Sequence, residues 1–334
     1  MKVYITASSA ITPQNTFDSE KYLDVWQSSD LPYQLAIEPD YKSVIDPKLA
    51  RRMSRIIKMS VATGNKVLAE ADIGQPDAIV VGTGLGCIKD TEKFLREIIN
   101  EEEGLLSPTA FIQSTHNTIA GQLALMLQCS EDNFTYVNRG HSFENALADA
   151  MMRIYEGADH VLLGGTDEMT SEVHNILTHM NCGGNTLLGE GACFFMISNT
   201  KIDGAVCIEG LDTVNYITTQ QITERVKSFL RRNNVDTNEV DALILGIGEG
   251  LGDPYYKEII QMFTPDIPVI NFKEVTGEYF TASAYAFNVG SEMLRKQCIF
   301  PKILISGNNT SGLTKVLIYN HYQGVNHTIS LLSL

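Results

Sequence analysis

The feature that most constrains this chain is an internal repeat, because the second half runs through the same order of strand, turn and helix as the first. Residues 241–248 (Asp-Ala-Leu-Ile-Leu-Gly-Ile-Gly) repeat the pattern of residues 77–84 (Asp-Ala-Ile-Val-Val-Gly-Thr-Gly). Residues 269–294 likewise match the strand, turn and helix that are expected over residues 135–150. Self-similarity of this kind indicates two copies of one supersecondary unit.

The expected strands of both halves are apolar along their whole length. We interpret residues 302–307 as the counterpart of the apolar strand over residues 160–166. Strands that are apolar on both sides are typical of sheets with helices packed on both faces, which predicts the α/β class. We expect an N-terminal half over residues 1–200 and a C-terminal half over residues 201–334.

The composition limits what the protein can bind. A net charge of −15 and an isoelectric point near 4.9 argue against binding nucleic acid or an anionic membrane, since both reward a basic face. No run of roughly 18 apolar residues occurs, so we expect a soluble, cytoplasmic protein. The six cysteines include no Cys-x-x-Cys pair, which gives no sign of a zinc site or a disulfide framework. We expect neither a metal nor a cofactor.

Residues 135–150 carry the most informative local pattern, a β-type segment that leads through a tight turn into a helix. Such a turn presents one side chain at the start of a buried helix, where free N–H groups and the helix dipole lower the pKa of a thiol. The residue expected at the tip is His141, and its neighbours supply no cysteine. The positive end of a helix disfavours a protonated imidazole. We therefore interpret His141 as a histidine satisfied at a helix start rather than as a catalytic group.

An ordered set of landmarks surrounds this turn. They are Pro108, Asn117 and Gly121-Gln122 before it, and Gly157-Ala158-Asp159, Gly164-Gly165 and Leu188-Gly189-Glu190-Gly191-Ala192 after it. With this set the chain resembles the thiolase-fold condensing enzymes, and within them the β-ketoacyl-[acyl-carrier-protein] synthases. The resemblance covers nearly the whole chain. It implies a duplicated thiolase fold with five layers in the order αβαβα.

In the enzymes that the chain resembles, a cysteine thiolate takes the acyl chain and two histidines stabilise the enolate that forms as CO2 leaves. The cysteine position matches His141. The first histidine belongs to a His-Gly-Thr pattern that places Leu245 there or, one residue later, Gly246. The second follows a Lys-Ser-x-x-Gly pattern that places Glu278 there. A carboxylate would oppose the developing enolate charge. The resemblance thus implies that the chain does not condense acyl groups on its own.

The resemblance also implies a dimer. Residues 107–122 match a segment that, in condensing enzymes, lies at the dimer interface and borders the neighbour's acyl pocket. The candidate acyl-binding residues of this segment are Gln113, Thr115, His116 and Asn117. Type II polyketide systems contain a cysteine-less subunit, the chain length factor, which pairs with an active synthase and shapes its tunnel. The chain is similar to that subunit, and residues 111–117 resemble synthase-like proteins of aryl-polyene and flexirubin-type pigment clusters.

Three hypotheses follow from these observations. The first is a catalytically incompetent subunit that forms a heterodimer with an active ketosynthase in type II fatty acid or polyketide biosynthesis, with acyl carrier protein as an indirect partner. The second is an enzyme with altered chemistry that uses His141 and Glu278 as an acid/base pair. The third is a homodimeric scaffold that binds acyl chains without turnover. A neighbouring synthase gene with an intact Cys-His-His set would favour the first.

Overall fold

The computed structural model describes residues 2–18, 20–27, 30–100, 104, 106, 108–180, 186–248, 253–308 and 312–334. The strands are β1 (Val3–Ile11), β2 (Ala78–Gly82), β3 (Asp132–Tyr136), β4 (His160–Asp167), β5 (Gly191–Ser198), β6 (Val206–Asn215), β7 (Ala242–Leu245), β8 (Val269–Asn271), β9 (Leu304–Ser306), β10 (Lys315–Tyr322) and β11 (Asn326–Ser333).

The α-helices are α1 (Pro47–Ala50), α2 (Arg55–Ala71), α3 (Ile88–Asn100), α4 (Pro108–Gln113), α5 (Thr118–Leu127), α6 (Ser142–Glu156), α7 (Ser171–His179), α8 (Thr219–Arg232), α9 (Pro254–Ile260), α10 (Lys273–Thr276) and α11 (Ser283–Lys296). Short 3-10 turns are η1 (Tyr41–Ser43), η2 (Arg139–His141), η3 (Thr237–Glu239) and η4 (Pro301–Ile303). None of the helices described is long and apolar enough to cross a membrane.

The described strands form one sheet in the order β3-β2-β4-β5-β1-β6-β11-β10-β7-β8-β9. In the first half β2 pairs in parallel with β3 and β4, and β5 runs antiparallel to β4 and β1. In the second half β7 pairs in parallel with β8 and β10, and β11 runs antiparallel to β10 and β6. The two arrangements mirror each other across the antiparallel pair β1 and β6. The predicted duplication is confirmed.

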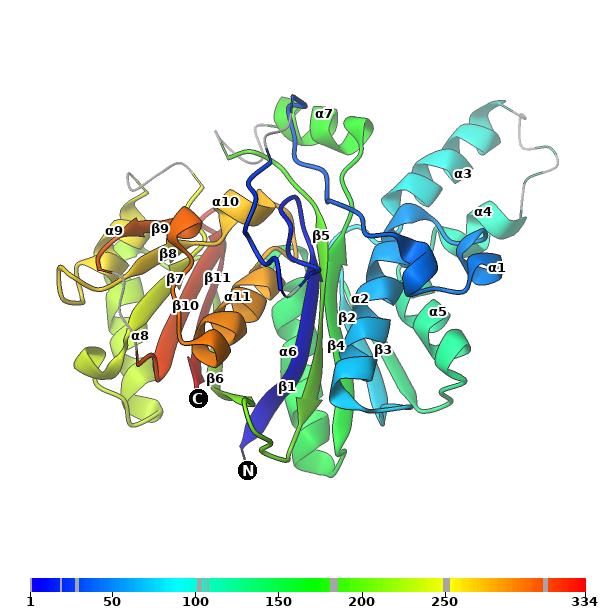
Figure 1. The fold of residues 1–334 in the computed structure, drawn as a ribbon. Coiled ribbons are helices and arrows are strands. Elements are labelled where there is room, and N and C mark those ends of the chain that lie inside the picture. The colour runs from blue at the N-terminus through cyan, green and yellow to red at the C-terminus, as the bar shows by residue number, and fades with distance from the viewer. Residues whose placement is uncertain are drawn as a thin grey trace.

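The sheet curls around a central layer of two helices, α6 and α11 (Figure 1). Helices α2 and α5 cover the outer face of the first half, and α8 and α9 cover the outer face of the second half. Three large apolar clusters fill the spaces between these layers. The central cluster contains residues from both halves, including Phe143 of α6, Phe195 of β5 and Phe287 of α11. The predicted five-layer αβαβα architecture follows.

The apolar strands explain the layers, because alternate residues of one strand enter different clusters. In β2, Ile79 and Val81 pack under α2, whereas Val80 packs toward α6. In β7, Leu243 and Leu245 pack toward the outer helices, whereas Ile244 joins the central cluster. Each of these six side chains is fully buried. A strand covered on both faces loses the polar alternation that marks a half-exposed sheet.

The interpretation of residues 302–307 as the counterpart of β4 is wrong. The strand in that stretch, β9, pairs antiparallel with β8 at the edge of the sheet. The topological counterpart of β4 is β10, which pairs in parallel with β7 and antiparallel with β11. In β10 the apolar run from Val316 to Tyr319 is followed by the buried polar residues Asn320 and His321, whereas β4 and residues 302–307 both carry glycines at the end of the apolar run. The division of the chain at residue 200 stays a proposal.

Candidate functional site

The turn between β3 and α6 is built around His141. The short helix η2 ends at this residue, and His141 is the N-cap of α6, with 3% of its surface exposed. Ser142 Oγ donates to Arg139 O at 2.8 Å and accepts from Asn138 N–H at 2.9 Å, which fixes the turn. The left-handed backbone conformation falls on Arg139, with φ of 48°, and not on His141. The turn therefore holds His141 inside the protein.

The C-terminal hairpin of β10 and β11 closes over this turn. A Cβ on Gly140 would lie 2.4 Å from Cβ of Tyr322, so only glycine allows so close an approach. The Nε2 atom of His141 lies 3.2 Å from the carbonyl oxygen of His327, which is a hydrogen bond if Nε2 carries the proton. Burial lowers the pKa of His141. The hydrogen bond to the carbonyl of His327 opposes this effect but is the smaller of the two, so the net shift is downward. A buried, neutral, hydrogen-bonded imidazole agrees with the structural interpretation of His141.

The other two positions hold no histidine and are also committed to local contacts. Leu245 is fully buried at the end of β7 and belongs to the outer cluster beneath α8 and α9. Glu278 Oε2 accepts from Lys273 Nζ at 2.7 Å, and the side chains are 9% and 3% exposed respectively. The backbone of Glu278 bonds to Leu187 O and Gly189 N–H. Glu278 is thus one half of a buried ion pair.

The acid/base hypothesis requires His141 and Glu278 to share a reacting group within hydrogen-bond reach. In the described part of the chain each bonds to a different partner, His141 to the carbonyl of His327 and Glu278 to Lys273. A carboxylate that neutralises a buried ammonium makes a weak general base, because losing either charge leaves the other unpaired. The geometry favours structural roles for both residues.

The sequence interpretation missed a buried group of rings from the C-terminal hairpin and α9. His321 Nε2 lies 3.0 Å from Asp253 Oδ2, and the ring stacks on Tyr256 with centroids 4.7 Å apart. His327 Nδ1 lies 2.9 Å from the hydroxyl of Tyr319. Burial lowers the pKa of His327 to about 4, so this imidazole is neutral near pH 7.

A sequence signal for this ring group existed. The two histidines flank the turn at Gln323 and Gly324, where both residues have positive φ, and they pair across it: the register of β10 and β11 sets His321 opposite His327. Gly324 N–H donates to His321 Nδ1 at 3.1 Å, which leaves the Nε2 proton to donate to Asp253. Burial raises the pKa of Asp253, but the hydrogen bond and charge of His321 outweigh it, and the net shift is downward.

The candidate acyl-binding residues lie at the turn between α4 and α5, and two of them hold that turn in place. Gln113 Nε2 donates to Arg52 O at 2.7 Å, and Asn117 Nδ2 donates to Asn133 Oδ1 and Thr135 Oγ1, each at 3.0 Å. Thr115 and His116 are exposed. Thr115 and Asn117 line a surface groove of about 760 Å³ beside α5, whereas His116 does not. An acyl-binding role for the four residues stays a prediction.

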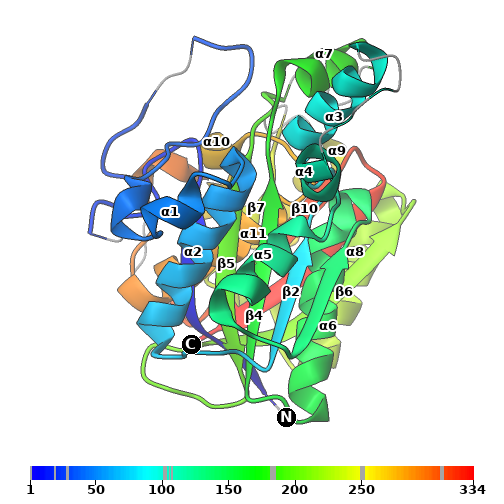
Figure 2. The same ribbon diagram turned by 90° about the vertical axis from the view of Figure 1, so that its right-hand side faces the viewer.

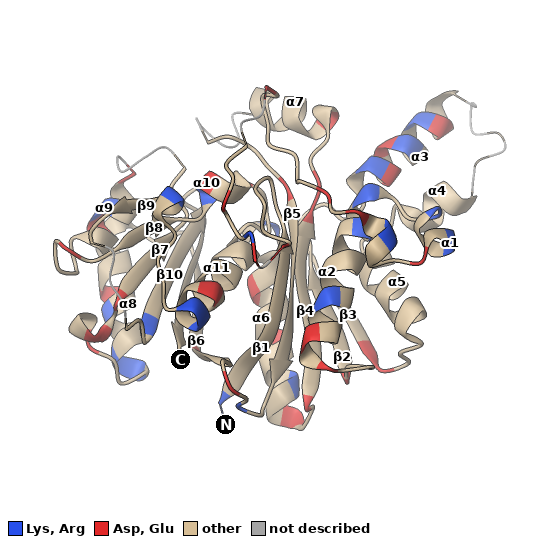
Figure 3. Cartoon of the chain, in the orientation of Figure 1, with Lys and Arg blue, Asp and Glu red and all other residues tan. Residues whose placement is uncertain are grey.

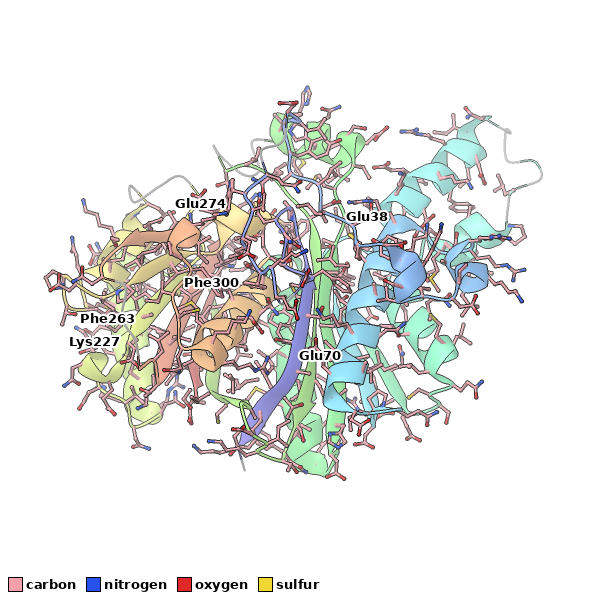
Figure 4. The ribbon with its side chains drawn as sticks, in the orientation of Figure 1. Glu38, Glu70, Lys227, Phe263, Glu274 and Phe300 are labelled. Atoms are coloured by element: carbon pink, nitrogen blue, oxygen red, sulfur yellow. The ribbon has the colours of Figure 1, made fainter. Side chains whose placement is uncertain are left out.

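Two buried carboxylates hold the site region together. Asp167, at the end of β4, accepts hydrogen bonds from Gly84 N–H at 2.7 Å and from both N–H and Oγ1 of Thr281, at 3.0 and 2.8 Å, so it links the two halves. Glu190 accepts from Arg55 Nη1 at 2.6 Å. Arg55 also pairs with Glu38, which Figure 4 labels in the loop beside α2. Glu190, a landmark of the resemblance, and Asp167 thus stabilise the framework around the site.

The sheet order, the shared central helices and the position of the turn before α6 define a thiolase-type fold. A family model described as "Beta-ketoacyl synthase, N-terminal domain" matches residues 24–188. Residues 24–188 therefore match the N-terminal domain of β-ketoacyl synthases, and this match confirms the resemblance that the sequence motifs indicated. No curated protein sequence matches the chain.

Solved structures with the same fold include ketosynthases and chain length factors. "The ishigamide ketosynthase/chain length factor" is 18% identical, with a TM-score of 0.78, and the match covers 100% of this chain and 99% of that chain. A β-ketoacyl synthase from Burkholderia phymatum is 14% identical, with a TM-score of 0.78 and 99% of both chains covered. A ketosynthase in complex with its chain length factor from Xenorhabdus doucetiae is 14% identical, with a TM-score of 0.77, covering 100% of this chain and 98% of that chain.

Proposed function

We propose that this chain is a non-catalytic, chain-length-factor-like subunit that pairs with an active ketosynthase in a type II polyketide or fatty acid system. The observation that carries the proposal is the state of the three positions that the resemblance matches to the catalytic cysteine and histidines. His141 is buried at the thiol position, Leu245 is a core residue, and Glu278 is tied up in an ion pair. The framework around them is intact. A subunit that has the fold but lacks the reacting side chains can still serve an active enzyme by completing the pocket of the other subunit.

The surface around α4, α5 and β3 supports pairing. The strand β3 is the end of the sheet, so its outer backbone groups have no strand partner among the described residues. Beside it, Ile112 is 63% exposed and Leu125 is 77% exposed, and both line the groove next to α5 (Figure 2 faces this side). Exposed apolar side chains next to an open sheet edge favour a subunit interface. Structures of the same fold include a ketosynthase bound to its chain length factor.

Partner choice separates this proposal from a homodimeric scaffold. A ketosynthase partner would supply the reactive thiol and the docking face for carrier protein, since the net charge of −15 disfavours an acidic carrier on most of this surface. Such a complex would act in the cytoplasm on carrier-linked thioesters. Co-expression with neighbouring ketosynthases, followed by purification through a tag on this chain alone, tests the proposal. Recovery of this chain only as a homodimer would favour the scaffold.

The purified chain is expected to take no acyl group from an acyl-carrier thioester, and His141→Cys alone is expected to leave it unable to condense. A thiol at position 141 would still lack both enolate-stabilising histidines, and groups that act together do not restore catalysis singly. Intact-mass spectrometry checks acylation, and product analysis with malonyl carrier protein checks condensation. Condensation by His141→Cys would show that the roles assigned to Leu245 and Glu278 are wrong.

Thr115→Trp and His116→Trp are expected to shorten the products of a paired ketosynthase or to slow its turnover, without unfolding either chain. Both positions are exposed at the α4–α5 turn, so a larger ring would project outward into a bound partner. Product length and rate are measured in the purified complex. Lys58→Trp, an exchange at a half-buried position of α2, is the control. Unchanged products in a complex that still co-purifies would leave only a scaffold role.

A further inference from the structure

A second cavity of about 760 Å³ lies away from the turn before α6, between α3, the start of α2 and the segment that leads into α7. Its wall includes none of the three catalytic positions and none of the four candidate acyl-binding residues. A cavity of this size is large enough for a small organic molecule. Figure 3 shows lysine and arginine positions along α3, on one side of the cavity.

The cavity wall contains an ionisable side chain without a partner. Asp90, in the first turn of α3, is only 8% exposed, yet neither of its carboxylate oxygens makes a hydrogen bond among the described residues, and Oδ2 is completely shielded. Ser54 Oγ, also in the wall, lies near Asp90 but makes no hydrogen bond of acceptable geometry and does not cap α2. Buried polar groups in native proteins almost always have partners. Asp90 Oδ2 and Ser54 Oγ therefore have no hydrogen-bond partner in the described part of the chain.

A second carboxylate adds to the acidic character of this wall. Glu168 is 3% exposed and accepts only the backbone N–H of Lys89, at 3.1 Å, among the described residues. Burial raises the pKa of Glu168 to about 7, and the charges of Glu190 and Asp90 contribute to the increase. A positive group placed between these carboxylates would relieve the repulsion and provide the missing donors.

Two arginines at the cavity are paired elsewhere. Arg55 is bonded to Glu190 and Glu38, and Arg96 is paired with Glu172 at the rim. Lys89 and Lys93 also line the wall, but no hydrogen bond joins either ammonium to Asp90 among the described residues, so a donor from outside the chain can occupy this position. An ammonium group fits this need, because it carries one positive charge and three N–H donors in a small volume.

We propose that this cavity binds a small organic molecule through a primary ammonium group, which donates hydrogen bonds to Asp90 and lies beside Glu168. The remainder of the molecule extends toward the rim, where α3 places Lys89 and Lys93. A zwitterion with a terminal carboxylate would engage these lysines, whereas a diamine would not. The site is independent of the proposed pairing with a ketosynthase.

Isothermal titration of the full chain with two four-carbon probes tests the proposal. Putrescine and γ-aminobutyrate share the ammonium group and differ in the other end, and at least one is expected to bind with a dissociation constant of about 1 mM or tighter. Butyrate lacks the ammonium, and tetramethylammonium lacks N–H donors, so neither should bind. Tighter binding of γ-aminobutyrate than of putrescine would identify a zwitterionic ligand. Tighter binding of putrescine would identify a polyamine.

Two variants locate the binding. Asp90→Asn is expected to weaken the affinity at least about tenfold, as the loss of a charge-assisted hydrogen bond does. Leu35→Trp places a ring in the cavity wall while leaving Asp90 itself unchanged, and it is expected to block binding. Glu131→Gln, an exposed carboxylate elsewhere, should leave binding unchanged. The proposal would be overturned if neither ammonium probe binds, or if butyrate or tetramethylammonium binds as tightly as they do. It would also be overturned if Asp90→Asn and Leu35→Trp bind the probes with the affinity of the parent chain.

Discussion

Lys273→Met should lower the free energy of unfolding by about 3–5 kcal/mol, the usual cost of leaving one member of a buried ion pair alone. The Nζ atom of Lys273 lies 2.7 Å from Glu278 Oε2, and the two side chains are 3% and 9% exposed. Methionine replaces the alkyl chain but not the charge, so the variant isolates the loss of the ammonium. Urea unfolding followed by circular dichroism measures the change.

The matched control is the double variant Lys273→Met with Glu278→Met. Removing both charges is expected to restore the stability to within about 1–2 kcal/mol of the parent chain, because a buried pair and an apolar pair of similar volume differ little. A loss of less than about 1 kcal/mol in Lys273→Met would mean that water reaches Glu278 and that the pair is not desolvated. Glu278 would then again be a candidate for the acid or base of a reaction.

Glu144→Gln should raise the free energy of unfolding at pH 8 by an amount on the order of 3 kcal/mol. Glu144 lies in the first turn of α6, is fully buried, and accepts from Thr328 Oγ1 at 3.0 Å, while its Oε2 has no hydrogen-bond partner in the described structure. Burial raises its pKa from 4.5 to about 7. The amide keeps an acceptor oxygen and carries no charge to bury.

The sign of the pH dependence follows from that shift. Between pH 4.5 and about pH 7 the folded chain holds a proton on Glu144 that the unfolded chain has released, so stability falls as the pH rises through this window. The advantage of Glu144→Gln should therefore be small near pH 4.5 and reach its full size above pH 7. Measuring both chains at each pH cancels the contributions of other groups, such as Glu168. A constant difference across the range would contradict a buried, proton-binding Glu144.

The fold was predictable because its strands are apolar on both faces and because the sequence repeats. The segments 77–84 and 241–248 became β2 and β7, which occupy matching places in the sheet. The mistaken placement of β9 has the opposite cause. Three apolar residues at a sheet edge look like a core strand in sequence, whereas β10 carries buried polar residues that look exposed.

For the candidate site, the sequence predicted only which catalytic residue types are missing. The sequence shows no cysteine at position 141 and no histidine at positions 245 and 278. It does not show what the replacements touch. Glu278 meets Lys273, five residues earlier, across the turn at Gly277, whose φ is 66°, and this contact depends on the backbone of that turn. His141 meets the backbone of β11, 186 residues along the chain, and this contact depends on how the two halves are placed against each other.

The shared central layer has a consequence for how the chain reaches its native state. The inner face of α6 packs against α11, which follows more than a hundred residues later, and β11 must insert between β6 and β10. The stabilising contacts are thus mostly non-local, which slows folding. During synthesis the first half waits with the apolar side of α6 uncovered, and in that interval it is open to aggregation and to capture by chaperones.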